Sequence, residues 1–113
     1  MPQNKNKLIT LFIGNISNAI THKILENSIN IKELSSKYQK EQLNSYNLAK
    51  KYRAKINPTN APLLFKDSNL IKTKTINKVT SELNLRISKG YQGIDLRQIE
   101  PLTEKYLKET KVN

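Results

Sequence analysis

The pattern of apolar and polar positions between residues 31 and 57 predicts one long central helix. Ser36 and Gln39 have the spacing of a capping box, so we expect the helix to begin near Lys37. Asn57 and Pro58 then end it, because the residue before a proline disfavours helical backbone. Four residues share one side of this helix at about 100° per residue: Tyr38, Ala49, Tyr52 and Ile56.

The first 28 residues show helical spacing in two runs that are separated by a break. The two runs comprise Leu8, Leu11 and Phe12, and then Ala19, Ile20 and Ile24. Gly14 and Asn15 lie between them, and both residue types are typical of turns. We therefore expect a short helix to about Ile13, a turn, and a second helix from Ser17 to Asn27.

A loop follows the central helix, because two prolines, Pro58 and Pro62, lie close together. The apolar run 63–65 is expected to anchor this loop in the core. Asp67 or Ser68 can cap the next helix, and Gly90 is expected just beyond its end. The apolar side of that helix repeats at steps of three and four residues: Ile76, Val79, Leu83 and Ile87.

The last segment turns at Gly93 and is expected to form a final helix from Pro101, with proline at its first position. Neither an internal repeat nor a strand-like alternation is found. The sequence thus predicts an all-α fold, a small domain of about four to five helices with helix-turn-helix elements. Residues 1–90 are expected to form the globular part and residues 91–113 a C-terminal extension.

The charge of the chain favours a polyanionic partner. Of its 113 residues, 20 are lysine or arginine and 9 are acidic, which gives a net charge of +11. Seventeen of the cations are lysines, which act as point charges toward phosphate, whereas arginine makes the bidentate contacts that read bases. Binding to a nucleic-acid backbone is therefore the favoured interpretation. The alternative is that the lysine content reflects an AT-rich genome.

Composition gives no support to an enzyme, a metal site or a membrane protein. The chain has no cysteine, and His22 is its only histidine. The acids are scattered, and no arrangement typical of a nucleophile with its base or of a phosphate-binding loop is present. We expect no cofactor and no metal. No apolar run approaches the roughly 20 residues of a membrane helix, and the first 22 residues lack the arginines of a transit peptide.

The segment from Arg86 to Arg97 is the first candidate RNA-binding surface, because cations, turn amides and an aromatic ring occur together there. Its members are Arg86, Lys89, Tyr91, Gln92 and Arg97. The basic end of the central helix is the second candidate: Lys50, Lys51, Arg53 and Lys55. Lys105 and Lys108 of the tail complete the set. For each of these surfaces, the alternative interpretation is an ordinary helix end whose charges are solvated and bind no ligand.

Four short segments occur in one order along nearly the whole chain. They are Pro2 to Lys5 before Leu8, Ile9 and Leu11; Asn15, Ile16 and Ser17 before Lys23, Ile24 and Leu25; Ile31 to Ser36 with Gln39; and Leu85, then Tyr91, Gln92, Gly93 and Ile94, then Pro101. This set resembles the thirteenth protein of the small ribosomal subunit, the S-thirteen family in its bacterial and mitochondrial form. The family has Pro-x-x-Lys, Gly-Ile-Gly, the entry to a central helix, and Tyr-Arg-Gly-Leu or Tyr-Arg-Gly-Ile at these places.

The chain also departs from the family. Asn15 and Ser17 replace the two glycines of Gly-Ile-Gly, and Gln92 replaces the arginine after the tyrosine. The family's basic Arg-Gly-Gln-Arg-Thr tail corresponds here to residues 103–107, which are mostly not basic. In the family this tail reaches toward transfer RNA in the peptidyl site, and the departure weakens the expectation of that contact here.

The resemblance implies a non-catalytic constituent of the small-subunit head. Its partners would be small-subunit ribosomal RNA, neighbouring head proteins and the large-subunit protein called L-five, which forms a bridge between the subunits. A fast-evolving mitochondrial genome would explain both the sequence drift and the missing transit peptide. We therefore expect a mitochondrial location, with the cytoplasm of a prokaryote with an AT-rich genome as the alternative.

Two other classes of function remain open. A small viral or plasmid protein that packages or regulates DNA would have the same charge and helicity, although no expected helix gathers the Arg, Asn and Gln side chains of a recognition helix. A helical adaptor that binds another protein is the third class. A large exposed apolar stripe would favour this adaptor.

Overall fold

The computed structural model describes residues 4–29, 31–57 and 61–112. Every regular element in these ranges is helical, which confirms the all-α prediction. The elements are α1 (Lys5–Ser28), α2 (Lys32–Ile56), α3 (Phe65–Ser88), the short 3₁₀ helix η1 (Leu96–Gln98) and α4 (Ile99–Glu109).

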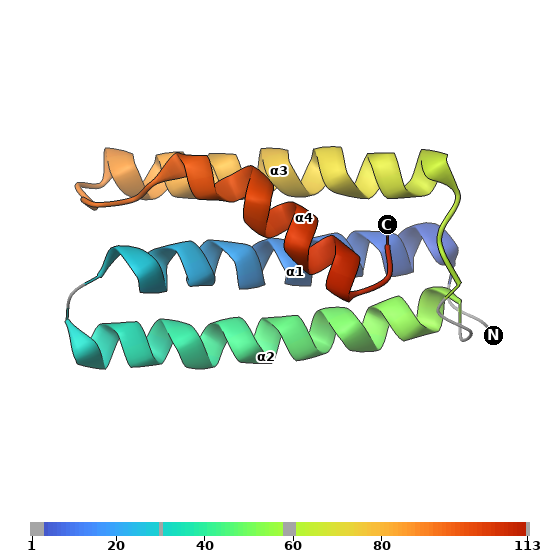
Figure 1. Cartoon of the computed structure of the whole chain (residues 1–113), viewed down its shortest axis with the longest axis horizontal. Helices are drawn as coiled ribbons and strands as arrows, with labels where there is room; N and C mark the ends of the chain where they lie inside the picture. The colour runs from blue at the N-terminus through green and yellow to red at the C-terminus, as the bar shows by residue number, and fades with distance from the viewer. Residues whose placement is uncertain (1–3, 30, 58–60, 113) are drawn as a thin grey trace.

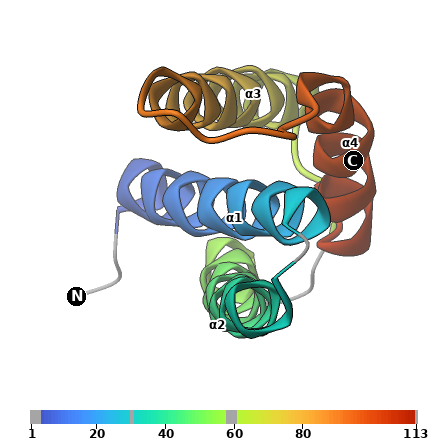
Figure 2. The same cartoon turned by 90° about the vertical axis from the view of Figure 1, so that its left-hand side faces the viewer.

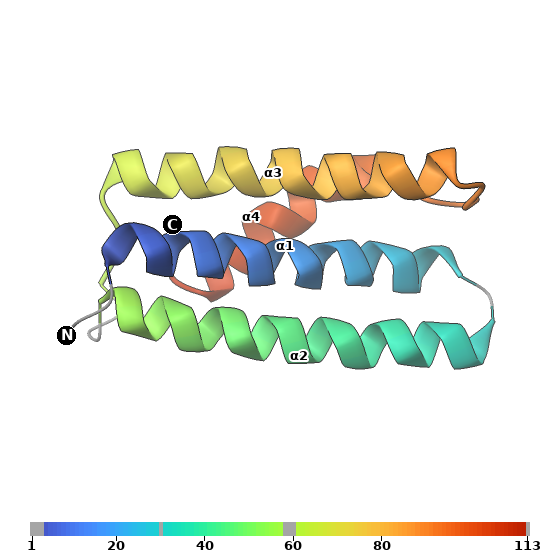
Figure 3. The same ribbon diagram turned by 180° about the vertical axis from the view of Figure 1, so that it is seen from behind.

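Three long helices lie side by side, with α1 between α2 and α3 (Figure 1). α2 runs antiparallel to α1, whereas α3 runs parallel to it. α4 crosses α1 obliquely (Figure 1) and covers one of its faces (Figure 2), whereas none of the described helices covers the opposite face (Figure 3). The molecule is elongated, with extents of 43 × 24 × 22 Å.

α1 forms the centre of the core because it contacts all three other α-helices. Phe12, Ile16, Ile20 and Ile24 are fully buried, and α4 contributes Leu107 to the same cluster. By length and composition alone, α1 could cross a membrane, but a core helix has the same properties and most of its apolar window is buried here. Its apolar character is explained by burial on several sides.

The predicted break at Gly14 and Asn15 is wrong, since α1 is continuous through both. Asn15 stays helical, and its side-chain amide donates a hydrogen bond to the Leu11 carbonyl at 2.9 Å. A glycine inside a helix costs only about 1 kcal/mol. Burial of the apolar residues on both sides of Gly14 against the same neighbours outweighs that cost.

α2 begins at Lys32, earlier than the predicted start near Lys37. The Ser36 and Gln39 capping box does not form, because the Ile31 carbonyl already accepts the backbone N–H of Ser35 at 3.0 Å. The predicted end of the helix at residue 56 is confirmed. The predicted apolar side of α2 is also confirmed. Ala49 is fully buried, and Tyr38, Tyr52 and Ile56 are partly buried against the core.

The start of α3 also differs from the prediction. The helix begins at Phe65, and Asp67 pairs with Lys5 at 2.7 Å instead of capping it. Leu63 packs against the core, but Leu64 and Phe65 are 71% and 82% exposed, so the expected apolar anchor is wrong for these two. They lie where the chain enters the helix on the surface.

The end of α3 confirms the predicted role of Gly90. Its φ of 102° lies in the left-handed region, which glycine adopts without a steric penalty. The N–H of Gly90 donates to the Ile87 carbonyl at 3.0 Å, and that of Tyr91 donates to the Arg86 carbonyl at 3.1 Å. These two bonds form a Schellman motif.

The C-terminal segment packs on the same core as the three long helices. α4 begins at Ile99, two residues before the predicted start, so Pro101 lies within its first turn. Tyr106, Leu107 and Val112 are buried together with α1 residues. Residues beyond Gly90 thus complete the hydrophobic core.

Candidate nucleic-acid interface

Most of the positive charge lies on the surface without an acidic partner. Four of the 20 lysines and arginines pair with a carboxylate: Lys5 with Asp67, Lys23 with Glu26, Lys72 with Glu104, and Arg97 with Asp95. Arg53 is buried. Each of the other cations has no carboxylate of the described residues within 4.0 Å. Their fields are therefore available to an external anion.

The structure brings Arg86 and Tyr91 of the first candidate surface together. The Arg86 guanidinium carbon lies 5.6 Å from the Tyr91 ring centroid, a cation–π geometry. The Schellman motif produces this contact, because it turns the chain back beside the last turn of α3. Lys89 and Gln92 flank the pair and are exposed.

Tyr91 also lies near Tyr38 of α2. The pKa of Tyr38 is raised because burial desolvates its hydroxyl, and the neighbouring Tyr91 adds to the effect. On its other side, Tyr38 stacks on His22, with ring centroids 5.9 Å apart. His22 Nε2 in turn lies 3.1 Å from Glu41. Tyr91 is still 39% exposed, so part of its ring could contact a base.

Arg97 does not act together with Arg86. Its Nε and Nη2 atoms donate to the Asp95 carboxylate at 3.0 and 3.2 Å. The same carboxylate accepts the backbone N–H of Arg97, and these bonds hold the pKa of Asp95 below its ordinary value. The pair carries no net charge, so the predicted segment 86–97 divides into a cationic part at the α3 end and a neutral pair at η1.

The second candidate surface lies on the last turns of α2. Lys50, Lys51 and Lys55 are all exposed. Lys50 Nζ lies 5.6 Å from the Tyr46 ring centroid, and Lys55 Nζ lies 5.7 Å from that of Tyr52. The two tyrosines thus hold two of the ammonium groups in place on the helix surface.

The prediction that Arg53 belongs to this surface is corrected by its burial, since only 2% of the residue is exposed. Its guanidinium donates to Asn57 Oδ1 at 2.8 Å and to the carbonyls of Ala61 at 2.8 Å and Lys111 at 2.7 Å. Burial lowers the pKa of Arg53, because water no longer stabilises its charge. The side chain therefore points into the fold and not toward a ligand.

The tail meets the end of α2 at one end of the molecule. Lys105 and Lys108 are exposed on α4. Beyond them, Lys111 shares a hollow of about 310 Å³ with Lys50. Tyr46 donates to Glu109 at 2.8 Å in the same region, so one carboxylate lies among these cations. The sequence had given no reason to join the tail to the second surface.

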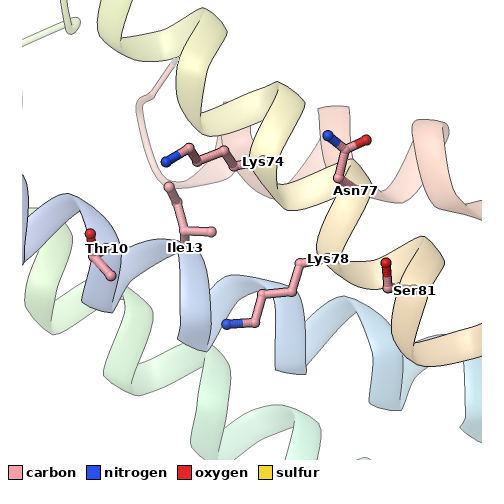
Figure 4. A pocket seen from close by; sticks show the side chains of 6 residues that line it. All are labelled: Thr10, Ile13, Lys74, Asn77, Lys78 and Ser81. Atoms are coloured by element: carbon pink, nitrogen blue, oxygen red, sulfur yellow. The ribbon is translucent and has the colours of Figure 1, made fainter. Parts of the chain in front are cut away.

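Sequence reasoning missed Lys74 and Lys78, which line a hollow between α1 and α3 with Thr10, Ile13, Asn77 and Ser81 (Figure 4). A signal was present, because the two lysines lie four residues apart in a stretch of α3 without acids. It could not be interpreted without knowing that this side of α3 faces α1. Within the described residues, no group of three or more His, Asp or Glu side chains could hold a metal ion.

No family model, curated protein or solved structure matches the chain.

Proposed function

We propose that this protein binds structured RNA through the phosphate backbone, as a non-catalytic component of a ribonucleoprotein particle. The observation that carries the proposal is the excess of exposed lysines that have no carboxylate partner among the described residues. Such groups neutralise phosphates and release counterions, which gives affinity without sequence readout. The cation–tyrosine pairs, such as Arg86 with Tyr91, add aromatic surface for unstacked bases.

The small ribosomal subunit is the particle that we propose, and the four ordered sequence segments are the support for it. The partners would then be small-subunit ribosomal RNA, neighbouring head proteins and the protein called L-five, in a mitochondrion. Gradient sedimentation of native cell extract, with sequencing of the RNA that migrates with the protein, tests this. We expect the protein with small-subunit RNA. Migration with DNA, or as a free protein, would rule out the ribosomal proposal.

The location of the RNA is tested by paired charge reversals. Arg86→Glu with Lys89→Glu should abolish incorporation into the particle, whereas Lys105→Glu with Lys108→Glu on α4 should weaken it mildly. Circular dichroism of each variant separates loss of binding from loss of folding. An equal or larger effect of the α4 pair would show that the main RNA surface lies elsewhere.

A protein-binding adaptor is the second candidate function, and one observation favours it. Leu64 and Phe65 are adjacent and strongly exposed, which is unusual for large apolar side chains. Within a particle, the same pair could contact a neighbouring protein. The sedimentation experiment separates the two functions, because an adaptor migrates with protein after ribonuclease treatment whereas an RNA-bound protein is released.

A further inference from the structure

The hollow between α1 and α3 lies on the face of α1 opposite α4 (Figures 3 and 4). Its volume is about 440 Å³, near the lower end of the range for ligand sites. Ile13 is the apolar residue of the lining, and the other five residues are polar or charged; most of the lined area is nevertheless apolar. This is a recess with room for a small polar group and the atoms next to it.

Lys74 and Lys78 extend from α3 toward α1 across this recess. They are one helical turn apart, a rise of about 6 Å. Lys78 Nζ lies 3.9 Å from the point where a Cβ on Gly14 would be. Because Gly14 has no side chain, the ammonium group comes close to the α1 backbone there.

Nothing in the walls of the recess balances these two charges. Residues 5–25 of α1 and 68–81 of α3 contain no acid. Glu82 is the nearest acid along α3, one turn beyond Lys78, and its carboxylate is not within 4.0 Å of either ammonium group. Like charges four residues apart on a helix repel each other, so an anion bound between them would remove a destabilising contact.

The other polar groups of the recess favour an anion with several oxygen atoms. The Ser81 hydroxyl can donate a hydrogen bond from the α3 side, whereas the Asn77 amide points away from α1 (Figure 4). Thr10 is already used, because its hydroxyl donates to the Asn6 carbonyl at 2.9 Å. Two ammonium groups and a hydroxyl suit a phosphate group, toward which lysine acts as a strong point charge.

We propose that the hollow between α1 and α3 is a phosphate-binding site, and that in the RNA complex it holds a phosphate of the backbone. The second part rests on the proposed function, whereas the first does not. Neither lysine belongs to the two surfaces expected from the sequence. The site would therefore be a third RNA-binding surface, in addition to the end of α3 and the last turns of α2.

The phosphate site itself is tested with inorganic phosphate and the full chain. Titration followed by amide NMR should shift resonances mainly at residues 13–14 and 77–78. Lys74→Gln with Lys78→Gln should remove these shifts, and the control pair Lys37→Gln with Lys40→Gln on α2 should retain them. If the resonance shifts were spread over all helices that carry lysines, and were equal in the wild type and in both variants, the proposed phosphate site would be ruled out.

The RNA part is tested by filling the recess with the chain's own charge. Gly14→Glu places a carboxylate beside Lys78, and Gly14→Gln places a neutral side chain of the same shape there; both residues are better helix formers than glycine. We expect the Glu variant to bind a folded RNA hairpin about tenfold more weakly than the Gln variant. The log affinity of the Glu variant should also fall less steeply with log salt, and the difference in slope should correspond to about one neutralised phosphate.

The outcomes separate the two proposals. If wild type binds RNA with strong salt dependence and the two Gly14 variants bind equally, the recess holds no backbone phosphate and the proposed function stands. If wild type does not bind RNA but inorganic phosphate still shifts residues 13–14 and 77–78, the proposed function fails and the phosphate site stands.

Discussion

Arg53 donates a hydrogen bond from Nη2 to the backbone carbonyl of Lys111 at 2.7 Å, across 58 positions of the sequence. The same nitrogen donates to the Ala61 carbonyl at 2.8 Å, and Nη1 donates to Asn57. One buried guanidinium therefore holds the end of α2, the following loop and the C-terminal turn together. Its planar arrangement of donors is what lets a single side chain serve acceptors from three segments.

Replacing this guanidinium by an ammonium group should destabilise the fold. Arg53→Lys keeps the charge, but lysine is one point donor and cannot reach all three acceptors. The carbonyls left unpaired and the poorly solvated charge should cost about 2–4 kcal/mol, which corresponds to a fall in Tm of roughly 8–17 °C. Thermal unfolding followed by circular dichroism measures it.

Lys51→Arg is the matched control for this substitution, because Lys51 is exposed on the same turn of α2. It should leave Tm nearly unchanged. If Arg53→Lys had no effect on Tm but weakened RNA binding, the guanidinium would be facing a ligand after all.

Gly14→Ala should stabilise the protein. The new Cβ would meet only Lys78 Nζ at 3.9 Å, an ordinary contact distance. Alanine in a helix interior is favoured over glycine by about 0.5–1 kcal/mol, so Tm should rise by roughly 2–4 °C. A fall in Tm would indicate that α1 breaks at this position, as the sequence alone suggested.

The fold was predictable from the sequence where local chemistry decides it. Gly90 ends α3 because its left-handed backbone closes a Schellman motif, and no distant residue is needed for that. The continuity of α1 was not predictable, since it depends on apolar residues on both sides of Gly14 packing against the same neighbouring helices. The exposed Phe65 was missed because an apolar residue need not be buried.

The candidate site was predictable only in part, for a similar reason. Lysines on the outer turns of α2 and α3 are exposed as expected, because charged side chains avoid burial. Arg53 has the same sequence signal, but its acceptors include a carbonyl 58 residues away, which no local pattern reveals. Lys74 and Lys78 become a pair across a recess only once α3 is placed beside α1.

Gly93→Ala should destabilise the protein more than Gly90→Ala. Both glycines have a positive φ, so each alanine bears a strain of about 1–2 kcal/mol. At Gly93 the new Cβ would also lie 3.1 Å from the backbone carbonyl oxygen of Ser28, whereas at Gly90 it would meet nothing within 4 Å. Urea unfolding of both variants measures the difference. Equal losses would show that the loop moves freely away from the end of α1.

Stability should fall between pH 10 and about pH 12, in part because of Tyr106. Burial raises the pKa of Tyr106 to about 12, and nearby carboxylates add to the effect. In the unfolded chain a tyrosine loses its proton near pH 10, so across this interval the unfolded state binds fewer protons and gains stability relative to the folded state. Unfolding by urea at several pH values measures the slope.

Tyr106→Phe should make that slope shallower, because phenylalanine has no proton to lose, while Tyr46, whose pKa burial also raises, keeps its own contribution. The variant also removes the hydrogen bond that Gln42 donates to the Tyr106 hydroxyl at 3.1 Å, so its stability at neutral pH should be lower. Lysine deprotonation occurs in both proteins and cancels in the comparison. The same slope in both proteins would mean that Tyr106 ionises as readily in the folded state as in the unfolded one.

The claim that this chain binds RNA through backbone charge is tested most directly by the affinity of the full chain for one folded RNA hairpin at increasing salt. We predict a linear fall of log affinity with log salt, amounting to about a thousandfold or more between roughly 50 and 200 mM if several phosphates are neutralised. A second hairpin of equal length and shape but different sequence should bind within a few-fold. Affinity that does not change with salt, or strong discrimination between the two hairpins, would contradict the claim.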